Sequence, residues 1–231
     1  SAPLAPDNNL IIKGKENEFQ KGLEVLAKLT SGKVHLGLNA NGVNAPAFAF
    51  TNASGVEKHW FKGQHPVGNV GIQIHHIDPI KKGGRVWTAG VQDVISIGAL
   101  FLTQKHDAAR IISLGGHLKN TGYIRTIAGA SIGDLTNGLV GENTRIISGD
   151  VLSGKQESSS GFLRYGDDQL SAIEEGNKEV LFGWAIPRIL PSISGAFPNK
   201  LMGDIKMDAN TNTNGEQRAF VMTGQYEDVL P

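Results

Sequence analysis

The stretch from Arg110 to Gly154 constrains the fold more than any other part of the chain, because short apolar runs alternate there with turn residues. Runs of this length and composition are typical of β-strands. We predict three strands in this stretch, at residues 110–114, 121–128 and 145–148. The stretch therefore predicts a small sheet built from neighbouring segments of the chain.

One short helix is predicted between the second and third of these strands. Ser131 and Asp134 are three residues apart and precede Leu135, which is an acidic version of the capping box that satisfies free N–H groups at a helix start. Gly138 follows where so short a helix would end. The order strand, strand, helix, strand predicts a β-grasp, a sheet folded over one helix.

The chain before this stretch alternates between strand and helix patterns. From Glu18 onward, apolar residues recur at helical spacing until Gly32, which predicts an amphipathic helix. Strands are predicted on either side of it, at residues 10–12 and 33–38. Alternation of this kind favours a sheet covered by helices.

Further along, residues 39–64 predict a loop with one apolar element at 48–50, and residues 70–77 fit either a strand or a short helix. A strand is predicted at 85–88. Residues 91–102 are apolar on nearly every side, which predicts a helix buried over most of its surface.

Beyond residue 154 the predicted elements are short. A polar loop at 155–161 is followed by strands at 162–165 and 170–173 around the turn Gly166-Asp167-Asp168. Residues 180–186 are apolar, residues 187–198 irregular, and Asn214-Gly215 predicts a hairpin.

Composition excludes several functions. Lys plus Arg and Asp plus Glu both number 22 in 231 residues, so no basic excess exists to neutralise nucleic acid. The absence of cysteine excludes disulfides, thiolate metal sites and a cysteine nucleophile within this chain. No apolar run approaches the roughly 20 residues that cross a bilayer, so we expect a soluble chain. The start at Ser1, without an initiator Met, predicts a fragment of a longer protein.

No nucleotide cradle or metal site is predicted. A dinucleotide site needs a glycine loop that follows a strand and opens a helix, and the nearest candidates, Gly83-Gly84 and Gly115-Gly116, are predicted to be turn glycines. Among seven histidines, the adjacent His75 and His76 would point to opposite faces of a strand. His59 and His65 have no ligand at a recognisable metal spacing. Nor is there a G-x-S-x-G nucleophile motif.

An ordered series of segments across the whole chain resembles the A subunit of the sodium-translocating NADH:quinone reductase. It includes GLEVL from Gly22, HPVG from His65, TIAGASIGDL from Thr126, TRIISGDVLSG from Thr144 and GQYEDVLP from Gly224. The order of so many segments is more specific than any single motif.

This resemblance implies a fold and a division of the chain. The fold class would be α/β plus α+β: a Rossmann-like α/β layer domain at residues 1–108, then a β-grasp domain at 109–180 of the ubiquitin-like, soluble-ligand-binding type (SLBB). Residues 181–231 would form an extended or hairpin segment. An N-terminal lipoyl-like domain and a C-terminal helical part of the family are missing here, so this would be the middle of the subunit.

The resemblance also implies a function. The complex oxidises NADH, reduces ubiquinone and pumps sodium. Its A subunit is a peripheral subunit on the cytoplasmic face of the bacterial inner membrane, docked on the membrane-embedded B subunit and associated with quinone binding. We expect this chain to bind no cofactor, and we expect NAD, flavins and iron–sulfur clusters in other subunits of the complex. Two alternatives stay open: a degenerate NADH or flavin site that takes part in electron transfer, and a free small-ligand-binding β-grasp module.

A quinone needs an apolar slot with one or two hydrogen-bond donors. His76, Trp87 and Phe101 suit that role by residue type, although packing in a core is the commoner role of such residues. We predict them as ligand-binding candidates for quinone, and we predict no catalytic, cofactor-binding or metal-binding residues.

Overall fold

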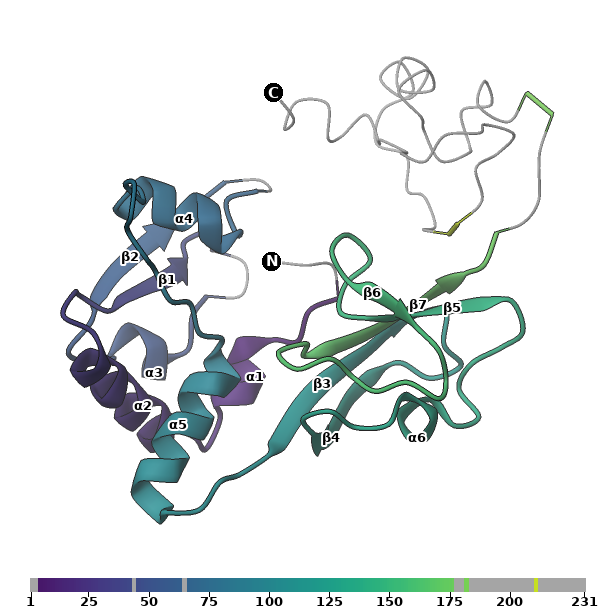
Figure 1. Ribbon diagram of the computed structural model, residues 1–231, viewed down its shortest axis with the longest axis horizontal. Helices are drawn as coiled ribbons and strands as arrows, with labels where there is room; N and C mark the ends of the chain where they lie inside the picture. The colour runs from purple at the N-terminus through teal and green to yellow at the C-terminus, as the bar shows by residue number, and fades with distance from the viewer. Residues whose placement is uncertain (1–3, 43–44, 64–65, 177–180, 183–209, 212–231) are drawn as a thin grey trace. The chain divides into compact units, whose positions relative to one another are not determined.

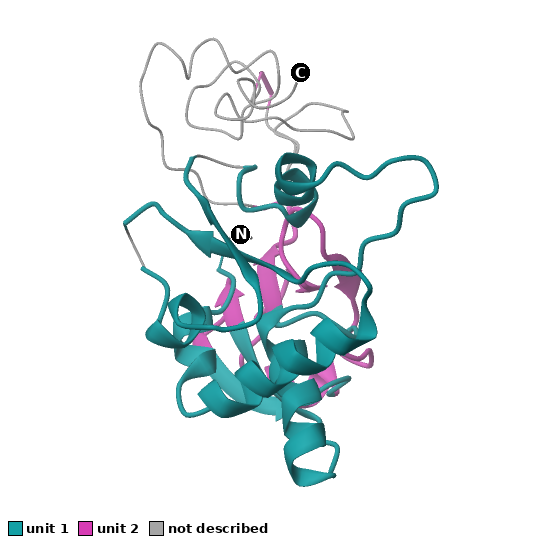
Figure 2. Cartoon of the chain, turned by 90° about the vertical axis from the view of Figure 1, so that its left-hand side faces the viewer, with its two compact units in different colours: residues 1–113, 123–130, 163–169 teal, residues 114–122, 131–162, 170–231 magenta. Residues whose placement is uncertain are grey.

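The structure is a computed structural model, and it describes residues 4–42, 45–63, 66–176, 181–182 and 210–211. The chain divides into two compact units with mixed α/β content (Figure 2). Unit 1 comprises residues 1–113, 123–130 and 163–169, and unit 2 comprises residues 114–122, 131–162 and 170–231. The boundaries predicted at 108 and 180 stay predictions.

Unit 1 begins with helices that surround a two-stranded parallel sheet (Figure 1). The strands are β1 (His35–Asn39) and β2 (Glu57–Phe61), and His35 pairs with Glu57 in their register. The helices are α1 (Asn8–Ile12), α2 (Glu16–Leu29), α3 (Phe48–Thr51), α4 (Val70–Ile77) and α5 (Val91–Thr103).

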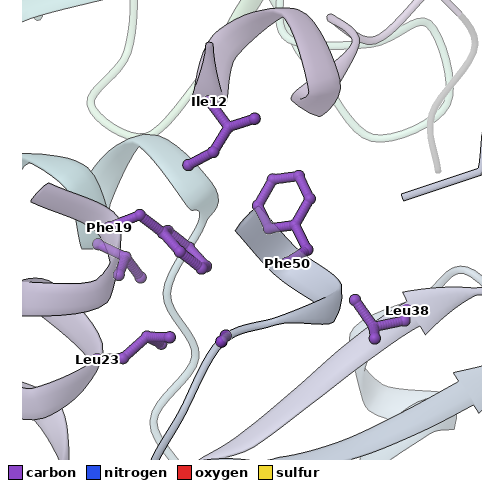
Figure 3. Packing of buried hydrophobic residues seen from close by; sticks show 7 residues of the cluster. Ile12, Phe19, Leu23, Leu38 and Phe50 are labelled. Carbon is purple, nitrogen blue, oxygen red and sulfur yellow. The ribbon is translucent and has the colours of Figure 1, made fainter. Parts of the chain in front are cut away.

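The core of unit 1 lies between α2, α3 and β1 (Figure 3). Phe19 of α2 meets Phe50 of α3 edge to face, with ring centroids 5.1 Å apart and planes at 88°, an arrangement that aromatic quadrupoles favour. Ile12, Leu23 and Leu38 close the cluster around them. The apolar residues that recur at helical spacing in α2 therefore form one buried stripe, as predicted.

Helices α2 and α5 pack against each other without side chains at their closest points. A Cβ atom on Gly98 of α5 would lie 1.7 Å from the carbonyl oxygen of Glu18, and one on Gly22 of α2 would lie 2.0 Å from that of Val94. Both distances are far inside van der Waals contact. Glycine at these two positions is what allows the two backbones to approach so closely.

Side-chain amides fix several backbone segments of unit 1 by making two hydrogen bonds each. Gln92 of α5 donates to the carbonyl of Ile111 and accepts from its N–H, both at 2.8 Å. Three more amides bond in the same two-sided way: Asn9 to Ala45 and Ala47, Gln20 to Ser54, and Asn41 to Gly63. They satisfy backbone groups that are not paired within a sheet.

The second sheet has five strands in the order β4-β3-β7-β5-β6. Their bounds are β3 (Ala109–Gly116), β4 (Gly122–Ile127), β5 (Thr144–Ser148), β6 (Lys155–Glu157) and β7 (Gln169–Glu174). Strands β6 and β7 both run antiparallel to β5.

The helix predicted after Ser131 is confirmed as α6 (Ile132–Thr136). The Ser131 hydroxyl accepts from the N–H of Asp134 at 3.4 Å, as the capping pattern predicts. Gly138 follows the helix with φ +70°. Ile132 and Leu135 are buried, so this short helix is held by its apolar face.

Several predicted strands are wrong. Residues 10–12 belong to helix α1, because the Asp7 carboxylate accepts from the N–H of Asn9 at 2.9 Å and caps a helical turn. Residues 85–88 are irregular and exposed, and residues 162–165 contribute only one bridge, between Ser131 and Phe162. Residues 70–77 take the helical alternative, as α4.

Three elements differ in extent or burial from their predictions. Strand β6 (Lys155–Glu157) lies within the stretch 155–161 that was predicted as a polar loop. Strand β2 lies within the stretch 39–64, also predicted as loop. The prediction failed there because the sequence EKHWF is mostly polar and shows no strand pattern. Helix α5 occurs where predicted but is not buried nearly all round, since Leu100, Phe101 and Leu102 are exposed at its C-terminal end. Of residues 180–186 only 181–182 are described, and the predictions for 187–198 and 214–215 lie outside the described residues.

Candidate functional site

The three quinone candidates lie on unit 1 and are exposed. His76 is in the last turn of α4, Trp87 lies in the segment after it, and Phe101 is near the end of α5. Trp87 is 94% exposed and Phe101 59% exposed, so neither packs in the core, which was the commoner role for such residues. No contact recorded in the described part of the chain brings the three together, and their ligand role stays a prediction.

The hollow found in the described part of unit 1 lies elsewhere. Its volume is about 370 Å³ and it is open to solvent. It is lined by residues of α1, the start of α2, and α3 with its flanks, namely Asn9, Ile12, Lys13, Glu16, Gln20, Ala47, Phe48, Ala49 and Asn52. Phe48 is its large exposed apolar residue.

The segment from Asp78 to Gly90, here called segment 78–90, is exposed at every residue. It combines apolar side chains with more positive than negative charge: Ile80, Val86 and Trp87 stand among Lys81, Lys82 and Arg85, with Asp78 as the only acid. Exposed aromatic residues next to cations are typical of interaction surfaces. This segment is therefore a candidate contact surface.

The two glycine pairs do not form a phosphate cradle. Gly83 and Gly84 form a turn, as predicted: Gly83 has φ +83°, and the N–H of Gly84 donates to the carbonyl of Lys81 at 2.8 Å. The prediction of a turn at Gly115-Gly116 is wrong, since both residues end strand β3. Gly116 has φ +88°, and a Cβ there would lie 2.0 Å from the carbonyl oxygen of Ala172.

A polar cluster lies on one face of the two-stranded sheet. His35 of β1 pairs with Glu57 of β2, and Gly37 pairs with His59, so alternate residues of both strands place two imidazoles and one carboxylate on the same face. We call His35, Glu57 and His59 the β1–β2 cluster.

The polar atoms of the β1–β2 cluster converge. The Nδ1 of His35 lies 3.0 Å from the Nε2 of His59 and 3.5 Å from one oxygen of Glu57. One ligand atom from each of the three side chains lies within 4.8 Å of the others. All three side chains are partly exposed, so solvent reaches them.

Lys33 pairs with the second oxygen of Glu57. This hydrogen bond lowers the pKa of the Glu57 carboxyl and raises the pKa of the Lys33 ammonium. The carboxylate therefore stays ionised to a lower pH than a free glutamate would, with one oxygen toward Lys33 and the other toward His35.

Gln73 of α4 lies over the same face, next to Gly37. A Cβ atom on Gly37 would come within 2.5 Å of the Gln73 side-chain oxygen, and the Gln73 amide donates to the carbonyl of Val67 at 3.1 Å. Glycine at position 37 thus leaves room for this amide beside the cluster.

A search for metal spacing along the sequence missed this cluster. It considered His59 together with His65 in the same loop, whereas the partner imidazole comes from His35, which lies 24 residues earlier on another strand. The cluster could have been predicted by pairing the two segments HLGLN and EKHWF as neighbouring strands, because this pairing brings their polar residues together. That pairing requires knowing that residues 57–61 form a strand.

Two family models match the chain. One, described as the NqrA second alpha/beta domain, matches residues 1–106, and the other, described as the NQRA C-terminal domain, matches residues 111–159. Together they follow the order of the two predicted domains.

Curated relatives match across nearly the whole chain. Subunits A of the Na(+)-translocating NADH-quinone reductase from Neisseria meningitidis serogroup B and from Shewanella frigidimarina are 40% identical over 99% of this chain, and the one from Saccharophagus degradans is 41% identical over the same share. The chain spans about half the length of these relatives, 51% in each case. Among the described helices, none has the length and apolar character needed to cross a membrane.

Proposed function

This chain belongs to the family of A subunits of the Na(+)-translocating NADH-quinone reductase, and on that premise we propose that it serves as a peripheral part of such a complex. The observation that carries the proposal is the 40% identity over 99% of the chain. The complex would oxidise NADH, reduce ubiquinone and transport sodium. This chain would lie on the cytoplasmic face of the bacterial inner membrane.

Within this proposal the two parts of the chain have the folds that the resemblance implies. A Rossmann-like assignment of the first part is supported by the parallel pairing of β1 with β2 and by the helices around them. A β-grasp assignment of the second is supported by the mixed sheet with the short helix α6 between β4 and β5.

The chain itself would bind no redox cofactor and would catalyse no step, while NAD, flavins and iron–sulfur belong to other subunits. Support comes from the glycine pairs, because Gly83-Gly84 is an exposed turn and Gly115-Gly116 ends a strand. Neither pair lies at the start of a helix. In Rossmann sites the dinucleotide phosphate binds to a glycine loop at a helix N-terminus.

Segment 78–90 would be the surface by which this chain docks on the membrane-embedded B subunit. Burying an exposed tryptophan on a partner removes a large apolar area from water, and such residues dominate binding energy at interfaces. Lys81, Lys82 and Arg85 around it would favour an acidic counterpart on the partner. The quinone candidates His76 and Trp87 lie at or next to this segment, so docking and quinone binding would be neighbours.

The first test is calorimetric titration of the whole chain with NADH, with FMN and with a short-chain ubiquinone. The proposal expects no saturable binding of either nucleotide. Saturable binding of NADH or FMN would overturn the cofactor-free role and favour the degenerate redox site. Binding of quinone that weakens in a His76→Ala variant would support the predicted quinone residues, and unchanged binding in that variant would remove His76 from the proposal.

The second test is assembly with the B subunit. We expect Trp87→Ala to lower co-purification with the B subunit by about tenfold or more, the effect of losing a central interface tryptophan. Trp60→Ala is the matched control, because Trp60 is also exposed on unit 1 but lies on β2 outside the segment. Equal losses in both variants, or none in either, would contradict docking through segment 78–90.

A further inference from the structure

We propose that the β1–β2 cluster binds one zinc ion through His35, Glu57 and His59. Two imidazole nitrogens and one carboxylate oxygen are ligands that Zn²⁺ takes in proteins, and three protein ligands leave one coordination position open. This inference does not depend on the proposed function, because it rests on the geometry of unit 1 alone.

Two of the three distances in the cluster suit a tetrahedral ion, and the third, between His59 and Glu57, is within 4.8 Å. Zinc lies about 2.0 to 2.1 Å from each ligand atom, so two ligand atoms of a tetrahedron are about 3.3 Å apart. The Nδ1 of His35 lies 3.0 Å from the Nε2 of His59 and 3.5 Å from the nearer oxygen of Glu57. The ligand atoms therefore need shifts of only tenths of an ångström around these two contacts to receive the ion.

The backbone fixes the relation between the three ligands. His35 and Glu57 are direct partners in the parallel register, and His59 stands two residues after Glu57 on the same face. Their Cβ positions are thus set by strand pairing and not by loop conformation, which lowers the cost of ordering them around an ion. Gly37, opposite His59, adds no side chain of its own, and the amide of Gln73 lies beside it.

Lys33 supports the site instead of competing for the ligand oxygen. It pairs with one oxygen of Glu57, whereas the other oxygen faces His35. A hydrogen-bonded partner behind a ligating carboxylate orients it, as the outer partners of known metal sites do.

The fourth position would face solvent, because His35, Glu57 and His59 are all partly exposed. The amide oxygen of Gln73 lies over the neighbouring Gly37. Water or this amide oxygen would complete the coordination of the ion.

The test is competition of the whole chain with a colorimetric zinc chelator, followed by Co²⁺ absorption spectroscopy. We expect one Zn²⁺ per chain, and visible Co²⁺ bands of the intensity that four-coordinate sites give. Loss of one ligand in His59→Ala or Glu57→Gln should weaken binding by about 100-fold or more, since even partners behind the ligands cost 10- to 100-fold. His106→Ala is the matched control, an exposed histidine far along the chain from the cluster.

A thermal readout separates a defined site from loose association. At a zinc concentration 100 times the dissociation constant, binding should raise Tm by about 5 to 10 °C in a chain of this size. At the same zinc concentration the rise should fall below about 2 °C in Glu57→Gln, which keeps the shape of the side chain, and stay intact in His106→Ala.

Three results would overturn the proposal. They are the absence of saturable zinc binding by the natural chain, equal affinity in the natural chain and Glu57→Gln, or Co²⁺ bands of six-coordinate intensity. The first of these would leave the cluster as an ion pair of Lys33 with Glu57 beside two hydrogen-bonded imidazoles. Should His59→Ala fail to fold by circular dichroism, the Glu57→Gln variant and the Co²⁺ spectrum of the natural chain decide the matter.

Discussion

Two regions of unit 1 have similar apolar composition and opposite surroundings. Helix α5 packs so closely on α2 that Gly98 and Gly22 leave no space for a Cβ atom. Helix α4 has four apolar residues among eight, yet none of its residues is buried, and segment 78–90 after it is exposed throughout. Apolar composition therefore does not decide which helix enters the core.

What decides it is whether the described part of the chain offers the helix a complementary surface. Helix α5 meets the glycine-containing face of α2, and its N-terminus is tied down by Asp93, which accepts from the N–H of Gly90 at 3.1 Å and pairs with Arg110. No side-chain hydrogen bond caps the start of α4. We infer that stability is concentrated at the α2–α5 contact, whereas α4 and segment 78–90 are available for binding.

The largest expected effect is that of a single methyl group at the α2–α5 contact. Gly98→Ala would place a Cβ 1.7 Å from a backbone oxygen, so the helices must separate, and we expect the free energy of unfolding to fall by about 3 kcal/mol. Gly71→Ala in α4 is the control, since nothing lies within 4 Å of a Cβ placed there. Alanine at this position should raise the free energy of unfolding by up to about 1 kcal/mol. Urea denaturation measures both, and similar changes at the two sites would refute the comparison.

The next effect concerns the two helix starts. Asp93→Ala removes the bond to the Gly90 N–H and leaves the Arg110 guanidinium, whose side chain is only 11% exposed, without its carboxylate. We expect a loss of about 2 kcal/mol in the free energy of unfolding. Asn69→Ala, at the uncapped start of α4, should change it by less than about 0.5 kcal/mol. A larger loss at Asn69 than at Asp93 would reverse the assignment of stability.

A smaller effect comes from Asp168, near Arg110 and Asp93. Burial raises the pKa of this carboxyl above its usual value, while Arg110 opposes the rise. The folded chain therefore holds the proton more tightly than the unfolded chain does, so the stability contributed by this group falls as pH rises through the folded pKa. Asp168→Asn should gain less than about 1 kcal/mol at pH 7 and nothing once Asp168 is protonated in both states. Thermal unfolding of both proteins between pH 3 and 7 would measure this difference. An equal gain in stability of Asp168→Asn at pH 3 and at pH 7 would contradict the raised pKa of Asp168.

The smallest effect on stability is expected in segment 78–90. Trp87 is 94% exposed, so Trp87→Ala should shift the free energy of unfolding by less than about 0.5 kcal/mol. A loss of 2 kcal/mol or more in urea denaturation would mean that Trp87 supports the fold, and would count against segment 78–90 as a proposed binding surface.

Local patterns predicted the elements whose cause is local. The stripe of α2, the cap of α6 and the apolar runs of β3 and β5 are confirmed, since each depends on residues within one turn or one strand. Strand β2 was missed because its residues are mostly polar and its partner β1 lies 22 residues earlier in the chain. A strand of this kind is fixed by its neighbour and not by its own propensity.

The site residues also differ in whether local sequence or strand pairing determines them. His76, Trp87 and Phe101 were chosen by residue type, and type alone does not determine where a side chain lies. The β1–β2 cluster depends on the register of two strands, which sets which of seven histidines meet. Resemblance supplied the family, since it uses the order of many segments at once, but it carried no information on this cluster.

The two-sided amide bonds of unit 1 have a consequence for how the protein ages. Gln92 holds the N–H and the carbonyl of Ile111 with one oxygen and one nitrogen. Hydrolysis of such an amide to an acid keeps the shape and volume of the side chain, yet it turns the donor into a second acceptor facing a carbonyl oxygen. Asn41, which is followed by Gly42, holds Gly63 in this way. Replacement of its amide NH2 group by oxygen would remove the donor to the Gly63 carbonyl and loosen this loop, with water as the only reactant.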